Sequence, residues 1–273
     1  MIKIRKLESL NELSELKQNY FAQTTAPLDG MWHFGFVPMA KHFGFYFENN
    51  LVGFCCINEE SYMLQFYLRP DYHIYSQDLF TLIAEQNSSI IGSIKGAFVS
   101  TAEPHYLSLC FDNSSTFTVN ALMYQQSINT ENEQYNGVEM QLATLAQLAN
   151  FVQFAVINIS APEQWLNSYY SNLIERNELF GYWNDEQLLA AGECRLFDHY
   201  QTEYADLGVI VSQFKRGQGI AKKVLNSLVG YASEKGLTAI CSTESSNIAA
   251  QKAISQVGFD ASNRIVQFEF KLM

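Results

Sequence analysis

The hydrophobic and polar positions of this chain follow strand-like and helix-like patterns in turn, and one order of patterns occurs in both halves. Residues 44–53 and 181–192 each combine an aromatic run, a polar turn and a second apolar run, which is the pattern of a β-hairpin. Short apolar runs typical of buried strands follow at residues 64–68 and 207–211. The pattern therefore predicts a mixed α/β (α+β) protein built twice on one plan.

Apolar residues at helical spacing predict helices around these strands. Residues 10–16, 144–154 and 162–174 show this spacing, and a further helix opens at Ala221, directly after a loop that contains glycine. Strand and helix patterns thus alternate closely enough for both halves to fold as compact α/β domains.

The segment from Val211 to Ala221 carries the strongest chemical signal. It joins the apolar strand at 207–211 to the next helix through a loop with Gly217 and Gly219. The first N–H groups of a helix have no partners within the helix and carry partial positive charge. Glycine lets an anion approach these groups without interference from a Cβ atom. The segment therefore predicts a binding site for a ligand that bears phosphate.

Three known kinds of glycine loop bind phosphate groups after a strand, and their patterns differ. The Walker spacing G-x-x-x-x-G-K-[ST] does not occur, and the dinucleotide pattern G-x-G-x-x-G has Lys222 where its third glycine belongs. The pattern [RQ]-x-x-G-x-[GA] is matched by Arg216, Gly219 and Ala221. This stretch resembles the pyrophosphate loop of the GNAT acetyltransferase superfamily.

A second signature of that superfamily, N-x-x-A followed by a helix and Gly-Phe, is also present. Asn247, Ala250, Gly258 and Phe259 match it, and an apolar strand at 237–243 lies between the two signatures. The resemblance covers about residues 136–273. It implies a mixed, largely antiparallel twisted sheet flanked by helices.

The N-terminal half resembles the same plan without the glycine loop. Arg69–Tyr72 follow a strand as the superfamily form V-x-P-x-Y does, but residues 73–78 contain no glycine. Asp78 places a negative charge at the helix start, where it would repel a pyrophosphate. The alternative is an unrelated α/β domain whose hairpins match by coincidence.

We therefore expect two tandem GNAT-like domains. The first, residues 1–130, is a degenerate domain without a cofactor loop, and the second, residues 136–273, binds acetyl-CoA. A polar linker is expected within residues 127–137.

The resemblance also implies roles for individual residues. The donor is acetyl-CoA, and its pyrophosphate lies on the loop formed by Arg216, Gly217, Gln218, Gly219, Ile220 and Ala221. The pantetheine arm pairs with the strand residues Val209, Ile210 and Val211, and a backbone N–H there polarises the thioester carbonyl. Asn247 corresponds to the family asparagine near the pantetheine arm.

Transfer to an amine requires a general base, because a protonated amine cannot attack. Glu203 is the favoured candidate, with Asp206 and Glu193 as alternatives near the same strand. Many superfamily members protonate the thiolate with a tyrosine seven residues after the asparagine, but here that position is Ile254. Another donor, such as Tyr204, Ser255 or water, then serves, or the thiolate leaves unassisted.

Composition narrows the class of protein. The 273 residues are 48% hydrophobic and carry a formal net charge of −11, which argues against nucleic acid or an anionic membrane surface as partner. The five cysteines lie scattered in apolar runs, the five histidines show no metal-ligand spacing, and the chain shows no signal-peptide pattern or membrane span. We expect a cytoplasmic enzyme without a metal.

The sequence thus predicts an N-acetyltransferase that moves an acetyl group from acetyl-CoA to a primary amine of a small molecule or peptide. Two alternatives remain open. One is a catalytically weak module that senses acetyl-CoA, and the other is a tandem-GNAT acyltransferase that uses a different acyl donor.

Overall fold

The computed structural model of the protein describes residues 2–86, 88–127 and 136–271. The chain forms two compact units: an N-terminal unit, Met1–Leu122 with Asn263–Met273, and a C-terminal unit, Met123–Ser262. The expected linker at 127–137 lies largely outside the described residues.

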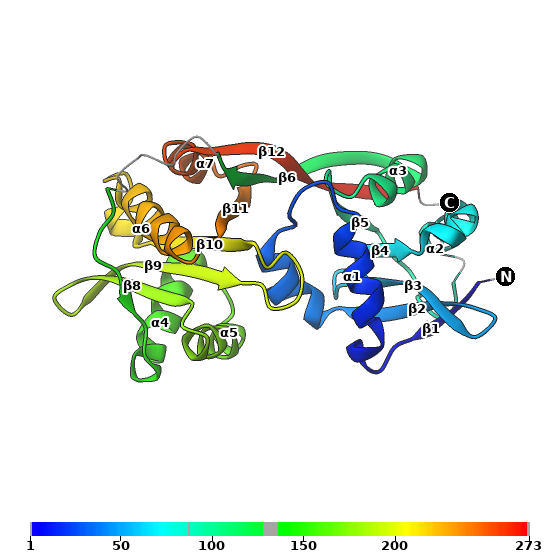
Figure 1. The fold of residues 1–273 in the computed structure, drawn as a ribbon, viewed down its shortest axis with the longest axis horizontal. Helices are drawn as coiled ribbons and strands as arrows, with labels where there is room; N and C mark the ends of the chain where they lie inside the picture. Colours follow the sequence, from blue (N-terminus) through cyan, green and yellow to red (C-terminus); the bar gives the residue numbers. More distant parts are fainter. Residues whose placement is uncertain (1, 87, 128–135, 272–273) are drawn as a thin grey trace. The chain divides into compact units, whose positions relative to one another are not determined.

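The N-terminal unit is a mixed sheet with helices on both faces (Figure 1). Its strands follow the order β1-β2-β3-β4-β5-β12-β6. In chain order its elements are β1 (Lys3–Lys6), η1 (Leu10–Leu13), α1 (Ser14–Ala22), η2 (Trp32–Phe36, a π-helix), η3 (Val37–Met39), β2 (Lys41–Phe47), β3 (Asn50–Ile57), β4 (Tyr62–Leu68), η4 (Pro70–Tyr75), α2 (Ser76–Ala84), β5 (Gly96–Ser100), α3 (Pro104–Asn113), β6 (Ser114–Gln126) and β12 (Phe259–Phe270).

Successive side chains along β3 and β4 point to opposite faces of this sheet. Phe54 of β3 lies opposite Tyr67 of β4, and both rings contact Tyr20 of α1. Their neighbours Cys55 and Phe66 point to the other face, where Phe66 contacts helix α2. Helix α1 therefore covers one face, and α2 with α3 covers the other.

The end of the chain completes the N-terminal unit. Residues 265–269 of β12 pair antiparallel with β5, and Phe268 is fully buried in the core between the sheet and helices α2 and α3. A Cβ atom at Gly96 would lie 1.8 Å from the Phe268 carbonyl oxygen, so glycine is required at this position of β5. The compact units thus differ from the expected division, which placed everything from 136 to 273 in one domain, because β12 finds its strand partner in β5.

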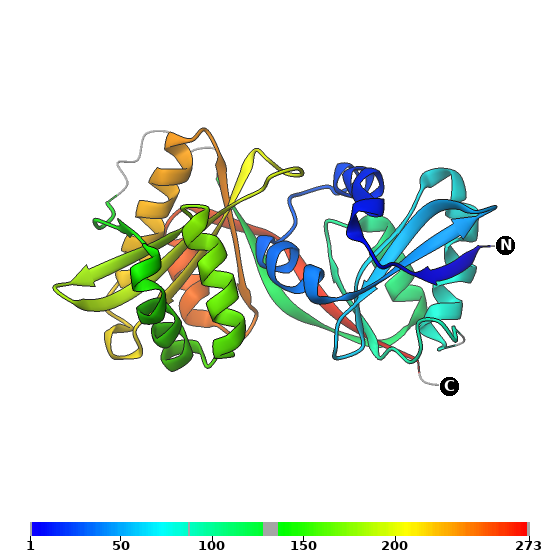
Figure 2. The same ribbon diagram turned by 90° about the horizontal axis from the view of Figure 1, so that it is seen from below.

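The C-terminal unit is likewise built on a mixed sheet with helices on both faces (Figure 2). Its strands follow the order β12-β6-β11-β10-β9-β8-β7. Besides parts of β6 and β12, its elements are β7 (Gln141–Leu142), η6 (Leu145–Gln147), α4 (Leu148–Ile159), α5 (Glu163–Glu175), β8 (Leu179–Asn184), β9 (Gln187–Leu196), β10 (Tyr204–Val211), η7 (Gln213–Lys215), α6 (Ile220–Glu234), β11 (Thr238–Glu244) and α7 (Ile248–Ser255).

Both predicted hairpins are confirmed. Strands β2 and β3 turn at Glu48 and Asn49, and β8 and β9 turn at Asp185, all with positive φ. Such φ values suit the tight turns whose twist matches that of the paired strands. The predicted strand, loop and helix from 207 onward are also present, as β10, η7 and α6.

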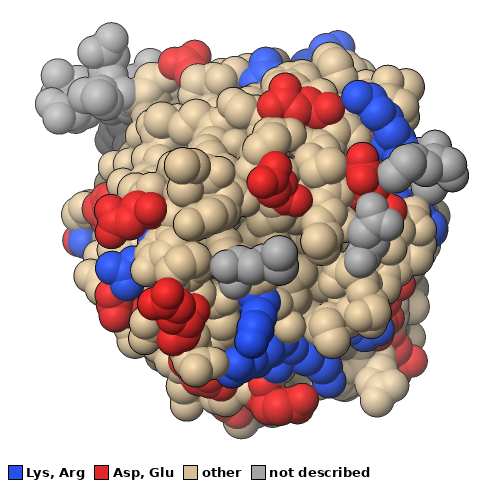
Figure 3. Space-filling model, turned by 90° about the vertical axis from the view of Figure 1, so that its right-hand side faces the viewer, with Lys and Arg blue, Asp and Glu red and all other residues tan. Residues whose placement is uncertain are grey.

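The edge strand β1 of the N-terminal unit is strongly basic. Lys3, Arg5 and Lys6 are all exposed on it, and charged side chains on an edge strand oppose pairing with another chain. On the face drawn in Figure 3, the largest group of lysine and arginine side chains lies at the lower centre, smaller groups lie elsewhere, and acidic side chains are spread across the surface. Across the described parts of the chain, every helix is too short or too polar to cross a membrane.

Candidate active site

Strands β10 and β11 separate part-way along their length. They pair in parallel at Tyr204↔Thr238, Ala205↔Ala239 and Asp206↔Ile240, and both strands then continue unpaired with each other, to Val211 and Glu244. A gap between two neighbouring strands leaves backbone groups of β10 available to a ligand.

The hydrogen bonds at the two ends of β10 show which of its backbone groups face this gap. The C=O of Glu203 accepts the N–H of Thr238 on the β11 side, and the N–H of Ser212 is donated to Leu189 on the β9 side. Because backbone groups of successive strand residues point to alternate sides, those of Val209 and Val211 face the gap. An extended ligand can therefore bond to β10 there as an added strand.

The glycine loop lies at the end of β10 and opens helix α6. Gly217 and Gly219 have φ of 74° and 75°, a left-handed conformation that favours glycine. A Cβ atom at either position would meet nothing within 4 Å, so the backbone conformation, and not crowding, requires glycine. Gly219 is the N-cap of α6 and supplies no side-chain hydrogen bond, which leaves the first N–H groups of the helix to an anion.

The second signature forms the start of helix α7. Asn247 is its N-cap, and the side-chain oxygen accepts the N–H of Ala250 at 3.2 Å. Ile254 is buried, and Ser255 beside it is exposed. Tyr204, the other hydroxyl considered, begins β10 at the end that pairs with β11, and partial burial raises its pKa.

Glu203 lies in the turn before β10, and its side chain is exposed. It precedes Val209 by six positions, which is about 20 Å along an extended strand. The gap begins beyond Asp206, so Glu203 lies at the opposite end of β10 from the backbone groups that face it.

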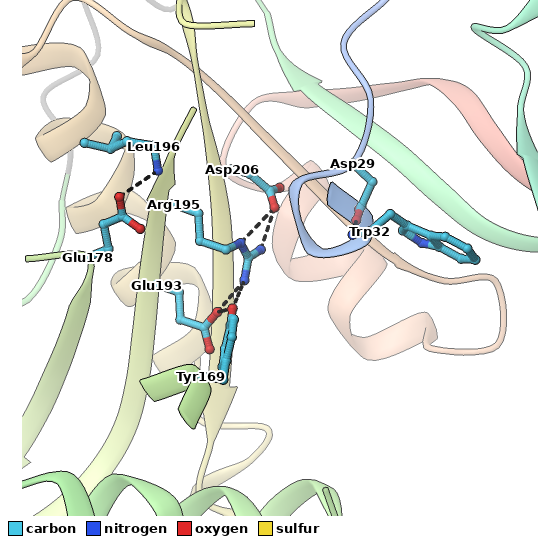
Figure 4. Close-up of polar contacts among 8 residues, drawn as sticks. All are labelled: Asp29, Trp32, Tyr169, Glu178, Glu193, Arg195, Leu196 and Asp206. Carbon is cyan, nitrogen blue, oxygen red and sulfur yellow. Dashed lines mark hydrogen bonds and ion pairs between the residues drawn. The ribbon is translucent and has the colours of Figure 1, made fainter. Parts of the chain in front are cut away.

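Glu193 lies much closer to the gap, within a buried charged cluster (Figure 4). Its Oε2 accepts the Tyr169 hydroxyl at 2.7 Å and forms an ion pair with Arg195. Arg195 also donates to Asp206 Oδ2 through Nε at 2.9 Å and Nη2 at 2.7 Å. Two carboxylates thus share one guanidinium, and the cluster has an excess of acidic groups.

Strand alternation and register bring these residues together. A Cβ atom at Gly192 would point at Val224 and Leu228 of α6, so Glu193 points to the opposite face, toward Tyr169 of α5. Glu193 is the cross-strand partner of Gly208, one residue before Val209.

Only one oxygen of Glu193 is used by the cluster. Both contacts go to Oε2, and the Glu193 side chain is 7% exposed. A Cβ atom at Gly208 would lie 3.1 Å from Oε2 and 3.0 Å from Arg195 Nη1, so glycine at this position leaves room beside the pair.

Burial sets the protonation of the cluster. Burial alone lowers the pKa of the Arg195 guanidinium, but Asp206, Tyr169 and Glu193 outweigh it and raise that pKa well above its usual value. Burial also raises the pKa of Tyr169, helped by Glu193 and opposed by Arg195. Arg195 therefore stays charged and Tyr169 stays a hydroxyl donor.

Glu193 and Asp206 were expected from the sequence as candidate bases, whereas Arg195 and Tyr169 were not. Glu193 and Arg195 are two apart on one strand and thus share a face, a signal that was available. The contribution of Tyr169 depends on how α5 packs, which no local pattern shows.

The N-terminal unit has the same strand separation but no glycine loop. Strands β4 and β5 pair at Tyr62↔Gly96 and Met63↔Ala97 and then separate. The hydroxyl of Tyr106, on α3, donates to the C=O of Met63 at 3.0 Å, so a side chain occupies the point where the strands part. This half therefore has the fold but not the loop geometry of the C-terminal unit.

Comparison with known proteins agrees with this arrangement. A model described as "Acetyltransferase (GNAT) domain" matches residues 9–127, and one described as "Acetyltransferase (GNAT) family" matches residues 145–259. The solved structure of a GNAT family acetyltransferase from Colwellia psychrerythraea is 64% identical, with a TM-score of 0.93, over 98% of this chain and 100% of that one. No curated protein sequence matched the chain.

Two more distant solved structures share the fold. A GCN5-related N-acetyltransferase from Sphaerobacter thermophilus is 9% identical, with a TM-score of 0.64, over 100% of this chain and 97% of its own. A tandem GNAT protein from the clavulanic acid biosynthesis pathway is 11% identical, with a TM-score of 0.65, over 98% of each chain. The expected fold class and family are thus confirmed, and the chain belongs to the GNAT acetyltransferase family as an acyltransferase with two tandem GNAT domains.

Proposed function

We propose that the protein transfers an acetyl group from acetyl-CoA to a primary amine, and that the C-terminal unit alone binds the donor. The observation that carries this proposal is the gap between β10 and β11 beside a helix that begins at a left-handed glycine without a side-chain cap. An extended arm that ends in a pyrophosphate fits both features at once.

The donor is held by backbone groups in this proposal. The first N–H groups of α6, together with the loop from Arg216 to Ala221, receive the pyrophosphate. The pantetheine arm runs along the gap and bonds to the backbone of Val209 and Val211, with Ile210 between them. A backbone N–H at this part of β10 polarises the thioester carbonyl and stabilises the negative charge that develops on its oxygen.

We assign the general base to Glu193 in place of Glu203. Glu193 Oε1 takes a proton from the acceptor's ammonium group, directly or through one water. The free amine then attacks the thioester carbonyl, the C–N bond forms, and the C–S bond breaks as the thiolate leaves. The nitrogen gives up its second proton to water as the amide forms. Arg195 and Tyr169 hold Oε2 and so fix the carboxylate in place.

The thiolate leaves without help from a tyrosine in this mechanism. Ile254, at the position where many family members have that tyrosine, is buried and carries no proton to donate. A thiol is a good leaving group as its thiolate, and water can return the proton afterwards. The same feature favours the second candidate function, an acetyl-CoA-binding module with little turnover.

The acceptor is expected to be a cationic amine of a small molecule or peptide. Glu193 and Asp206 together outnumber the single guanidinium of Arg195, so the cluster attracts an ammonium group. The chain as a whole carries a formal net charge of −11, which favours cationic over anionic acceptors in the approach to the site.

Calorimetric titration of acetyl-CoA into the wild type and a Gly219→Glu variant tests the proposal. The variant combines a side chain that disfavours φ of 75° with a negative charge where the pyrophosphate is expected. Gly236→Glu is the matched control, because Gly236 has φ of 72°, meets nothing within 4 Å and follows the far end of α6.

Saturable one-to-one binding, lost in Gly219→Glu and kept in Gly236→Glu, supports the proposal. No binding to the wild type contradicts it, and two sites per chain contradict the assignment of binding to the C-terminal unit alone. Release of free thiol with a panel of amines then separates the transferase from the binding module.

A further inference from the structure

Asn158, near the C-terminus of α4, contacts the glycine loop at two points. Its side-chain Oδ1 accepts the N–H of Gln213 at 2.7 Å, and its backbone C=O accepts a hydrogen bond from Arg216 Nη2 at 2.8 Å. Gln213 starts the short η7 turn and Arg216 follows it, so one residue holds both ends of this turn.

The orientation of the Asn158 amide is fixed from within α4. Its Nδ2 donates to the C=O of Phe154 at 2.7 Å, one helical turn earlier. Only the NH₂ group of an amide can donate to a carbonyl, so Oδ1 is the atom that faces the loop. The amide is therefore set to accept the Gln213 N–H before any ligand arrives.

The contact with Arg216 also satisfies the end of helix α4. The last carbonyl groups of a helix have no partners within it and carry partial negative charge. The guanidinium of Arg216 bonds to one of them, and its Nε lies 3.4 Å from the Val211 carbonyl oxygen. The side chain of the family's loop arginine is thus used here to join the loop to α4 and β10.

Few other contacts hold this part of the loop. Ser212 and Lys215 make backbone hydrogen bonds on the β10 side, but residues 216–219 are exposed and both glycines lie in open space. A loop that must be ordered on binding lowers the affinity for its ligand, whereas a loop ordered in advance does not.

We propose that Asn158 is a positioning residue that holds the pyrophosphate loop in its binding conformation before the donor arrives. This inference rests on the proposed function of the loop. It adds a specific requirement: the effect of Asn158 acts through the pyrophosphate and not through the thioester or the acceptor.

Two variants and two donors test this requirement. Asn158→Ala removes the Gln213 contact, and Asn167→Ala is its control, because Asn167 of α5 makes the same bond to a carbonyl one turn earlier, to Glu163 at 3.0 Å, without touching the loop. Steady-state kinetics are measured with acetyl-CoA and with S-acetylpantetheine, which has the same thioester but no pyrophosphate.

Asn158→Ala loses the hydrogen bond to Gln213 and with it the ordering of the loop. This loss is expected to raise the KM for acetyl-CoA roughly tenfold. The value of kcat, the KM for the acceptor and the KM for S-acetylpantetheine stay at wild-type values, and Asn167→Ala changes none of them. A merely structural role of Asn158 would change both donors alike.

Three results overturn the inference. An unchanged KM for acetyl-CoA in Asn158→Ala, with a wild type that binds it, overturns the role of Asn158 alone. An equal effect with both donors, or in the control, assigns the effect to general destabilisation. A wild type that binds no acetyl-CoA overturns this inference together with the proposed function.

Discussion

Each unit contains two parallel strands that pair over a few residues and then separate. The units differ in the residues that lie at this point of separation. In the C-terminal unit, β10 and β11 lead into a left-handed glycine loop and an uncapped helix. In the N-terminal unit, the 3-10 helix η4 runs directly into α2, and the N-cap Tyr75 has helical φ and ψ. A continuous 3-10 and α-helix offers an anion no free turn of N–H groups.

Side chains occupy the corresponding opening in the N-terminal unit. Tyr106, the third residue of α3, bonds to β4, whereas the third residue of α7 is Ala250. His73 of η4 and His105 of α3 stack with their ring centroids 3.9 Å apart, which joins the two helices that follow the strands. The two units thus differ at one strand opening and not in the fold, and in the proposed function this difference decides which unit binds the donor.

The positions of the charged cluster can also be compared between the two units. Gly53 of β3 and Gly192 of β9 are taken as equivalent, and positions are counted from them. Glu193 faces Gly208 and Arg195 faces Asp206 in the C-terminal unit. The corresponding pairs in the N-terminal unit are Phe54 with Tyr67 and Cys56 with Gln65. Uncharged residues fill the N-terminal positions, so acid–base chemistry is expected in one half only.

The largest expected effect concerns the strand that completes the N-terminal unit. Phe268→Ala removes a fully buried ring from the core between the sheet and α2 and α3, and it is expected to lower the free energy of unfolding of this unit by about 3–5 kcal/mol. Binding of acetyl-CoA at a temperature where both units are folded is expected to remain unchanged, because the loop belongs to the other unit. Denaturant unfolding and calorimetric titration measure the two effects.

Phe117→Ala is the control for that variant. Phe117 contacts the ring of Phe268 but is 55% exposed, so its removal is expected to change stability by about 1 kcal/mol or less. Equal losses in the two variants would show that β12 does not carry the core of the N-terminal unit.

The next effect tests whether acid–base chemistry is confined to the C-terminal unit. Glu193→Gln keeps the shape of the side chain but cannot take a proton, and we expect kcat to fall roughly a thousandfold, which is about 4 kcal/mol in the barrier. Donor affinity, measured by titration, stays unchanged because the loop and β10 backbone are not touched.

Glu203→Gln is the matched comparison for this prediction. Glu203 is exposed at the far end of β10, so its substitution is expected to leave kcat within about twofold of the wild type. The reverse outcome, a large loss of kcat in Glu203→Gln and none in Glu193→Gln, would identify Glu203 as the general base, as expected from the sequence.

The sequence predicted those features that local chemistry determines. Gly217 and Gly219 adopt the left-handed conformation that the loop requires, and both hairpins turn where polar residues interrupt the apolar runs. The pairing of β12 with β5 was not predicted, because an alternating strand pattern does not identify its partner across more than 150 positions. The sequence favoured Glu203 as the base, and the proposal of Glu193 depends on where β11 separates from β10, which counting along one strand does not show.

The helices that follow β5 and β11 also begin differently. Asn247 caps α7 as an exposed polar side chain, whereas the N-cap of α3 is the buried Glu103. Glu103 accepts the Tyr20 hydroxyl at 2.5 Å and the Ser100 N–H at 2.8 Å. The N-terminal unit thus contains a buried carboxyl group where the C-terminal unit has an exposed amide.

The smallest expected effect is a pH dependence of the free energy of unfolding of the N-terminal unit, caused by Glu103. The C-terminal unit has Asn247 at the corresponding position, which does not titrate. Burial raises the pKa of Glu103 from 4.5 to about 7, and the two hydrogen bonds oppose that shift only in part. Between pH 4.5 and 7 the folded state therefore holds a proton that the unfolded state releases. The free energy of unfolding falls by at most about 3 kcal/mol as pH rises through this window, and it levels off above it.

Glu103→Gln cannot titrate and is expected to flatten this slope, even though the amide fits only one of the two donors and lowers stability at every pH. Unfolding curves between pH 4.5 and 8 measure the slope, with Glu12→Gln, an exposed carboxylate of the same unit, as control. A slope that survives in Glu103→Gln would place the responsible proton elsewhere in the unit.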